Sequence, residues 1–176
     1  MSVCKKTYME KENFLALFEG IKYRYYAEGG AKSTKGKSNE YHAEWNNDVN
    51  KNAVCFTVNG CEEAQGRDAV HTLNAFFLDI DYPKGINEWE KGSRLSQLYQ
   101  DMEEKEFAPT VVVETKNGGH FYWILNPKIR HAEHSKNWNE ILTVYESIER
   151  EIVSFFGGDK GAEDVARVLR VPGSTH

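Results

Sequence analysis

The sequence has 176 residues, of which 40% are hydrophobic, 28% charged and 12% aromatic, and its formal net charge is −5. This length and composition suit one globular domain and exclude a disordered tail or a collagen-like repeat. The net negative charge also argues against nucleic-acid binding through bulk electrostatics, so any polyanion would have to be held locally.

The chain shows no sign of a membrane segment or of a disulfide framework. No apolar stretch approaches the roughly 20 residues that span a bilayer, and the first residues are polar. The cysteines Cys4, Cys55 and Cys61 are odd in number and lack CxxC spacing, which fits a reducing compartment. A zinc site from Cys55, Cys61 and His71 would lack a fourth ligand, so free thiols are the better interpretation. We therefore expect a cytoplasmic protein.

The N-terminal part combines short structured segments with a basic loop. The pattern predicts a helix over residues 11–19, an aromatic strand over 21–26 and another strand over 41–45. Between the strands, residues 29–39 are rich in glycine, serine and lysine without periodicity, which predicts a flexible loop. Residues 1–38 hold eight basic and four acidic side chains, a net charge of +4, and the remainder carries −9.

The middle of the chain predicts two strands and two helices. A strand over residues 53–58 ends at the turn dipeptide Asn59-Gly60, and a short helix is expected over 67–73. An apolar strand over 75–81 ends in acids. The length and charge pattern of residues 89–106 are typical of a surface helix.

The last third predicts a hairpin, a long helix and a final strand. Residues 110–114 and 120–125 are β-prone and lie on either side of a glycine-containing turn. The strongest helix pattern covers residues 135–156 and ends at two glycines, and a strand follows over 167–171. This succession predicts an α+β fold in which helices cover one face of a sheet.

Asp79 and Asp81 are the first candidate site residues. Strand alternation places both carboxylates on one face, while Phe76, Leu78 and Ile80 point to the other. Two parallel carboxylates repel each other, and a divalent cation such as Mg²⁺ or Mn²⁺, bound together with substrate phosphates, would remove that repulsion. The simpler alternative is a solvated strand end.

His120 follows Gly118 and Gly119 at the start of an aromatic strand. Glycines let backbone N–H groups approach an anion, and the histidine beside them can donate to a phosphate. A half-buried hairpin histidine is the alternative.

Asp164, Arg167 and Arg170 form the last group of charged candidates. Strand alternation would turn the two arginines to opposite faces, so that one binds phosphate while the other pairs with an acid. An ordinary salt-bridged strand is the alternative.

Three segments carry a resemblance to a known family. Residues 75–81, 109–123 and 164–173 resemble, in order and spacing, the three motifs of the archaeo-eukaryotic primase superfamily. The nearest resemblance is to the primase-polymerase domains of phages, plasmids and other mobile elements, and it covers residues 52–176.

The resemblance implies an RNA-recognition-motif-like palm with a mixed or antiparallel sheet and packed helices. It implies two Mg²⁺ or Mn²⁺ ions held by Asp79, Asp81 and Asp164, with His120 contacting the nucleotide phosphates. Gly118 stands where the family usually has serine, so a hydroxyl contact would be missing. The expected nucleotide-binding residues are His120, Lys116, Gly118, Gly119, Arg167 and Arg170.

The function implied is a template-directed nucleotidyltransferase, a DNA primase or polymerase that extends a 3′-hydroxyl or starts a primer. The partners implied are a single-stranded DNA template, NTP or dNTP, and a helicase domain in the same or a partner chain. The host would be a bacterial or archaeal cell, with a phage or plasmid origin. Lys32, Lys35 and Lys37 are candidate template contacts. We expect one catalytic domain over 1–176, with an N-terminal part over 1–50 and the palm over 51–176, as a fragment of a longer replication protein.

Three alternatives stay open. A rolling-circle initiator nuclease needs a His-hydrophobic-His cluster, and the histidines of this sequence form no such pair. A GGDEF-type cyclase is suggested by residues 157–160, but that string follows a long helix and lacks the second acid, so a glycine helix cap explains it better. A catalytically inactive RNA-recognition-like binding module is the third, and the retention of all three acids argues against it.

Overall fold

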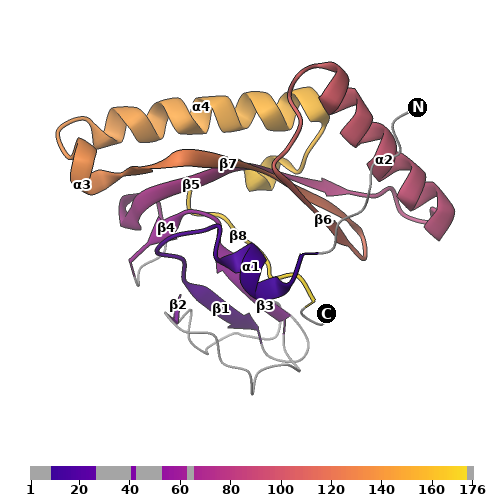
Figure 1. The fold of residues 1–176 in the computed structure, drawn as a ribbon, viewed down its shortest axis with the longest axis horizontal. Helices are drawn as coiled ribbons and strands as arrows, with labels where there is room; N and C mark the ends of the chain where they lie inside the picture. Colours follow the sequence, from indigo (N-terminus) through magenta and orange to yellow (C-terminus); the bar gives the residue numbers. More distant parts are fainter. Residues whose placement is uncertain (1–8, 27–40, 43–52, 63–65, 174–176) are drawn as a thin grey trace.

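The computed structural model describes residues 9–26, 41–42, 53–62 and 66–173, and its strands form two antiparallel sheets with helices packed around them (Figure 1). The strand order is β4-β5-β7-β6 in the larger sheet and β2-β1-β3-β8 in the smaller. The α+β class and the antiparallel sheet with packed helices are therefore as predicted. The sequence predicted one sheet with helices on one face, whereas the structure has a second, smaller sheet as well.

The larger sheet is built around two long strands. It consists of β4 (Gly60–Cys61), β5 (Val70–Asp81), β7 (Gly118–Arg130) and β6 (Val111–Thr115). The predicted hairpin is confirmed, since β6 and β7 pair from Val111 opposite Tyr122 to Thr115 opposite Gly118.

The short helix predicted over residues 67–73 is wrong beyond its first turn. Only Arg67–Ala69 is helical, as a single 3₁₀ turn, and β5 begins at Val70. Val70 and Leu73 are buried in one apolar cluster, and Val70 and Thr72 are β-branched, so burial in the sheet outweighs the local helix signal.

The smaller sheet joins segments that are far apart in the sequence. It consists of β2 (Tyr41–His42), β1 (Tyr23–Tyr26), β3 (Ala53–Thr57) and β8 (Val168–Arg170). Strand β1 pairs with β3, and β3 pairs with β8 through Cys55 opposite Arg170. The N-terminal part and the end of the described chain therefore share one sheet.

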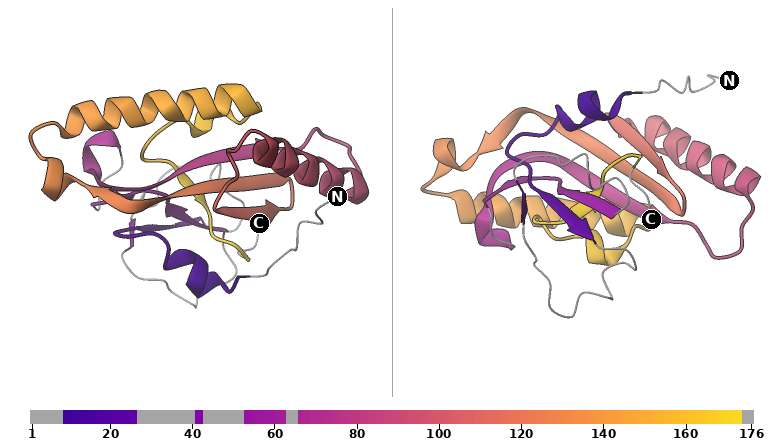
Figure 2. Two further views of the ribbon diagram at one scale, coloured as in Figure 1. Left: turned by 45° about the horizontal axis from the view of Figure 1, so that its top comes forward. Right: turned by 90° about the horizontal axis from the view of Figure 1, so that it is seen from below.

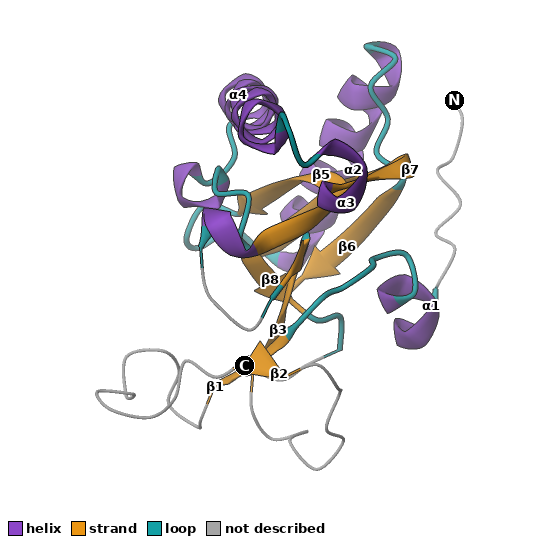
Figure 3. Cartoon of the chain, turned by 90° about the vertical axis from the view of Figure 1, so that its left-hand side faces the viewer, coloured by secondary structure: helices purple, strands orange, loops and turns teal. Residues whose placement is uncertain are grey.

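The two faces of the larger sheet bury different partners (Figures 2 and 3). Helices α2 (Glu88–Glu104) and α4 (Trp138–Phe156) cover one face, where Leu78 and Phe121 pack against their apolar side chains. The opposite face meets the smaller sheet and α1 (Lys11–Leu15) through a cluster that includes Phe77 and Tyr122. The short helix α3 (His131–His134) separates β7 from α4. Helix α4 therefore begins three residues later than predicted. It ends as expected before Gly157, whose φ of 74° is in the left-handed region.

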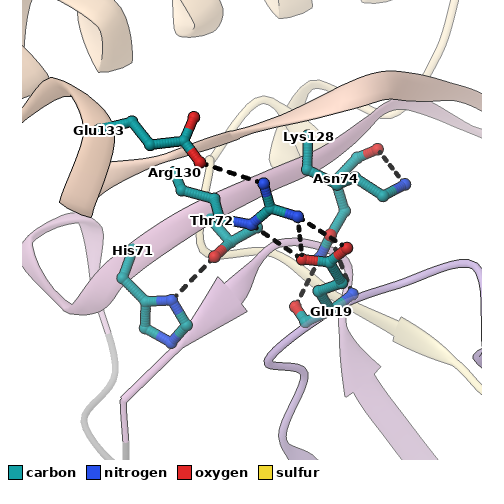
Figure 4. Close-up of polar contacts among 7 residues, drawn as sticks. All are labelled: Glu19, His71, Thr72, Asn74, Lys128, Arg130 and Glu133. Atoms are coloured by element: carbon teal, nitrogen blue, oxygen red, sulfur yellow. Dashed lines mark hydrogen bonds and ion pairs between the residues drawn. The ribbon is translucent and has the colours of Figure 1, made fainter.

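A buried amide anchors the N-terminal segment to β5 (Figure 4). The Asn74 side chain donates to the Glu19 carbonyl at 2.9 Å and to the Val58 carbonyl at 3.0 Å, and accepts from the Glu19 N–H at 2.9 Å. On the surface nearby, the Arg130 guanidinium donates to both carboxylate oxygens of Glu19, at 2.8 to 3.1 Å. These contacts fix the segment that follows α1.

Two side chains of α4 and one backbone N–H of the loop after it form hydrogen bonds with the backbone of β5. These bonds lie along the edge of β5 that faces away from β7. The Tyr145 hydroxyl donates to the Ala75 carbonyl at 2.6 Å, and the Phe77 N–H donates to Glu149 Oε1 at 3.1 Å. The Asp159 N–H donates to the Asp79 carbonyl at 2.9 Å. The strand that carries the candidate acids is thus held along its length.

Within the described ranges of the chain, no helix has both the length and the apolar composition to cross a bilayer.

Candidate active site

Asp79 and Asp81 lie at the end of β5, on the sheet face that also carries Ala75 and Phe77. The predicted alternation is as observed, since Leu78 packs toward the helices on the other face. The Asp79 side chain is only 20% exposed. Burial, followed by the negative charge of Asp81, raises the pKa of Asp79 to about 6. A carboxylate pair of this kind favours a bound cation.

His120 sits opposite Asp79 on β7 and is buried. Its Nε2 is 3.5 Å from Asp79 Oδ1, and its Nδ1 is 3.4 Å from the Tyr122 hydroxyl. Burial, with the charges of Arg170 and Arg167, lowers the pKa of His120 to about 4, so the imidazole is neutral at pH 7. Burial raises the pKa of the Tyr122 hydroxyl, which therefore keeps its proton and can donate to Nδ1. Donation from Tyr122 requires the proton of the neutral imidazole to be on Nε2, the nitrogen that faces Asp79.

Arg167 and Arg170 both act on this pair of residues. The positive charge of each lowers the pKa of Asp79 and that of His120. The expectation that one arginine pairs with an acid is met by Arg167, which forms an ion pair with Asp159, while the positive charges of both arginines act on Asp79 and His120. Arg167 precedes β8, so strand alternation does not constrain it, and its guanidinium reaches the Gly161 carbonyl at 2.8 Å and Asp159 at 3.3 Å.

Asp164 has a local role in the turn before β8. Its exposed side chain accepts from the Ala166 N–H at 2.9 Å, and its carbonyl accepts from the Arg167 N–H at the same distance. In the ranges that the structure describes, no three or more His, Cys, Asp or Glu side chains are grouped as metal ligands. The structure thus does not gather Asp79, Asp81 and Asp164 into the predicted three-acid site.

Asp159 is the acid that sequence reasoning missed. Its backbone N–H bonds the Asp79 carbonyl, and its negative charge contributes to the raised pKa of Asp79. The preceding glycines cap α4 as predicted, but they also let the loop lie against β5, because a Cβ on Gly158 would collide with Leu78. The sequence signal that could have indicated Asp159 is its position directly after the two glycines that end the helix.

Gly118 and Gly119 serve close packing, which contradicts the expectation of N–H groups open to an anion. Both are buried in β7 between β5 and β6, opposite Asp81 and Ile80 on one side. A Cβ on Gly118 would collide with the Ile80 carbonyl oxygen. The turn itself is Lys116-Asn117, and the Lys116 side chain is exposed at its tip.

The acid pair matches the ligand set of a hard divalent ion. Mg²⁺ is usually bound by one or two carboxylates together with substrate phosphates and water, and Asp79 and Asp81, whose charges interact, are the carboxylates here that could hold such an ion. The predicted template contacts Lys32, Lys35 and Lys37 lie outside the described residues.

Comparison with known proteins identifies one sequence relative and one similar structure. No family model matches the chain. A stretch of 110 residues, 60% of the chain, is 31% identical to a replication protein of Clostridium perfringens. The chain spans about a quarter of that protein's length.

The structure is similar to the AEP domain of the cyanophage S-2L primase-polymerase. The TM-score is 0.62, with 93% of this chain and 80% of the other covered, at 16% identity. The likeness confirms the fold expected from the three motifs.

Proposed function

We propose that this chain is a metal-dependent nucleotidyltransferase of the primase-polymerase type, acting in the replication of a phage, plasmid or other mobile element. The observation that carries the proposal is the acid pair Asp79 and Asp81 at the end of β5, with the charges of Arg167 and Arg170 beside it. The primase-polymerase fold and the replication-protein relative support it.

The reaction joins a primer to an incoming nucleotide. The 3′-hydroxyl oxygen bonds the α-phosphorus, the bond from that phosphorus to the β-phosphate oxygen breaks, pyrophosphate leaves, and the hydroxyl proton passes to solvent. Asp79 and Asp81 would hold the divalent ions, which lower the pKa of the hydroxyl and neutralise the phosphates. The family resemblance implies Asp164 as a third ligand, but its carboxylate bonds the Ala166 N–H in the turn before β8, and Asp159 is the acid whose charge acts on Asp79.

The basic residues and the histidine have distinct tasks in this proposal. Arg167 and Arg170 supply positive charge for the triphosphate, and Lys116 extends that charge to the hairpin tip. The buried, neutral His120 faces Asp79, so it orients that carboxylate and leaves direct phosphate contact to the cations. In that respect its role differs from the one that the family resemblance implies.

The test is nucleotide incorporation by the purified chain. Labelled dNTP or NTP is supplied with Mg²⁺ or Mn²⁺ on a primed and on an unprimed single-stranded template. We expect extension of the primed template, and the unprimed one decides whether chains are started de novo. The double variant Asp79→Asn with Asp81→Asn should be folded and inactive. Template binding without any incorporation would instead favour the inactive RNA-recognition-like module.

A further inference from the structure

Tyr122 lies on the same face of β7 as His120, and its hydroxyl reaches the His120 ring. In the pairing of β5 with β7, Tyr122 is opposite Phe77 and His120 is opposite Asp79. The Tyr122 hydroxyl is 3.4 Å from His120 Nδ1, and His120 Nε2 is 3.5 Å from Asp79 Oδ1. A continuous line of polar atoms therefore runs from Tyr122 through the imidazole to the Asp79 carboxylate.

The donors and acceptors along this line fit a neutral imidazole in one arrangement. An ionised carboxylate only accepts, so the ring nitrogen that faces Asp79 has to donate. Nδ1 is then an acceptor, and the Tyr122 O–H is the donor that it faces. Without that O–H, the nitrogen would lose a hydrogen-bond partner in a buried place, which weakens the preference for a proton on Nε2.

Three aromatic rings hold the Tyr122 ring in place. Phe14 and Phe18 meet it edge-on with centroids 5.4 and 5.5 Å away, and Phe56 lies 6.4 Å away in a tilted arrangement. All four rings are buried, and Phe14 belongs to α1, beneath the larger sheet in Figure 1. This packing matters because the two polar separations are long for hydrogen bonds, so a small movement of either ring would break them.

The backbone of Asp79 is held separately from its carboxylate. The Asp159 N–H donates to the Asp79 carbonyl at 2.9 Å, and the pairing of β5 with β7 continues past Asp79 to Asp81, opposite Gly118. The carboxylate can still rotate about its side-chain bonds. The contact from His120 Nε2 to Oδ1 restrains that rotation.

We propose that Tyr122 is a positioning residue for nucleotidyl transfer: its hydroxyl keeps the His120 proton on Nε2, and that N–H orients the Asp79 carboxylate for a divalent cation. This assignment rests on the proposed function, because it places the cation of that reaction at Asp79. It adds a role for a fully buried core tyrosine that lies outside the acids and cations of the site. Replacing an outer residue that orients a metal ligand typically changes metal affinity or activity about 10- to 100-fold.

The first measurement locates the His120 proton without any substrate. Long-range ¹H–¹⁵N correlation NMR of the full chain near pH 7 distinguishes the two neutral tautomers of a histidine, and comparison with His120→Gln identifies the His120 signals. We expect the Nε2–H tautomer in the wild type and a mixture of both in Tyr122→Phe, which deletes the hydroxyl and keeps the ring. Tyr145→Phe is the matched control. It deletes another buried hydroxyl, the one that donates to the Ala75 carbonyl, and should leave the His120 signals unchanged.

The second measurement is the affinity for Mn²⁺ alone, from the EPR signal of the free ion. The binding that is lost in the double variant Asp79→Asn with Asp81→Asn is assigned to the site. Tyr122→Phe should weaken this binding about tenfold and His120→Ala about 10- to 100-fold, whereas Tyr145→Phe should leave it unchanged. His120→Gln keeps an N–H donor that does not depend on the hydroxyl, so adding Tyr122→Phe to it should cause no further loss.

Two results would overturn the inference: a wild-type His120 with its proton on Nδ1, or a folded Tyr122→Phe variant with the Mn²⁺ affinity of the wild type. An equal loss of affinity in Tyr145→Phe would also overturn it, because it would reveal a general effect of removing a buried hydroxyl. Tyr122-dependent Mn²⁺ binding in a chain without nucleotide incorporation would support this role of Tyr122 and overturn the proposed function. Incorporation together with Mn²⁺ binding that is insensitive to Tyr122 would do the reverse.

Discussion

Glu149 on α4 accepts a hydrogen bond at 3.1 Å from the backbone N–H of Phe77, two residues before Asp79. Glu149 is fully buried, and its second oxygen, Oε2, has no hydrogen-bond partner. Burial raises the pKa of Glu149 to about 9, against the opposing effect of the Phe77 N–H. The side chain therefore carries its proton at neutral pH and acts as a neutral acceptor.

This protonation makes stability depend on pH. Between the ordinary glutamate pKa and about 9, the folded state holds a proton that the unfolded state has lost, so the free energy of unfolding falls as pH rises through that window. The slope approaches about 1.4 kcal/mol per pH unit for one proton. Glu149→Gln keeps an acceptor for Phe77 and should flatten the profile. Denaturant unfolding from pH 5 to 9 measures it, with Glu151→Gln, exposed on the same helix, as the control. Equal slopes in wild type and Glu149→Gln would contradict the assignment.

Gly118 should tolerate no side chain. A Cβ there would collide with the Ile80 carbonyl oxygen, so Gly118→Ala must push β7 away from β5 and should lower the melting temperature strongly. Gly92 in α2 is the control, because a Cβ there meets nothing within 4 Å. Gly92→Ala should stabilise the protein by about 1 kcal/mol through helix propensity. The measurement is the melting temperature of both variants in thermal unfolding. A Gly118→Ala protein as stable as the wild type would contradict the close packing of β7 against β5.

The acids should differ in their effect on incorporation. Asp79→Asn and Asp81→Asn should each abolish it, because each removes one of the paired carboxylates. Asp159→Asn should lower it by an order of magnitude or more, because it breaks the ion pair with Arg167, whose positive charge acts on Asp79, whereas Asp164→Asn should stay near the wild-type rate, because the Asp164 carboxylate bonds the Ala166 N–H in its own turn. Single-turnover extension of a labelled primer measures all four. A larger loss in Asp164→Asn than in Asp159→Asn would restore the ligand set implied by the family resemblance.

Asn74 and Arg130 should contribute unequally to the anchoring of the N-terminal segment. Asn74→Ala leaves the buried Val58 carbonyl without a partner, at about 1 to 3 kcal/mol, and also frees the part-buried N–H and carbonyl of Glu19. Arg130→Ala removes a solvent-exposed ion pair with Glu19 and should destabilise the protein much less than Asn74→Ala. Chemical denaturation at low and high salt separates the two, since only the Arg130 effect should shrink with salt.

Local patterns were enough to predict much of this structure. The shared face of Asp79 and Asp81 and the 110–125 hairpin follow from alternation and turn chemistry, and α4 follows from its helical period. The smaller sheet could not be predicted in this way, because β3 pairs with β8 more than a hundred residues later. For the same reason, neither the approach of Asp159 to Asp79 nor the burial of His120 beneath it is visible in any single motif.

The bonds from α4 and its following loop to Ala75, Phe77 and Asp79 also set the dynamics of the acid-bearing strand. Along this edge, the hydrogen bonds of β5 at Ala75, Phe77 and Asp79 are made with two α4 side chains and one loop N–H. This part of β5 therefore cannot unfold locally without breaking its contacts to α4. We therefore expect α4 and the strand that carries Asp79 and Asp81 to form one cooperative unit of local unfolding. The Phe77 amide should exchange its hydrogen with solvent only when that unit opens as a whole, which keeps the two acids in register between such events.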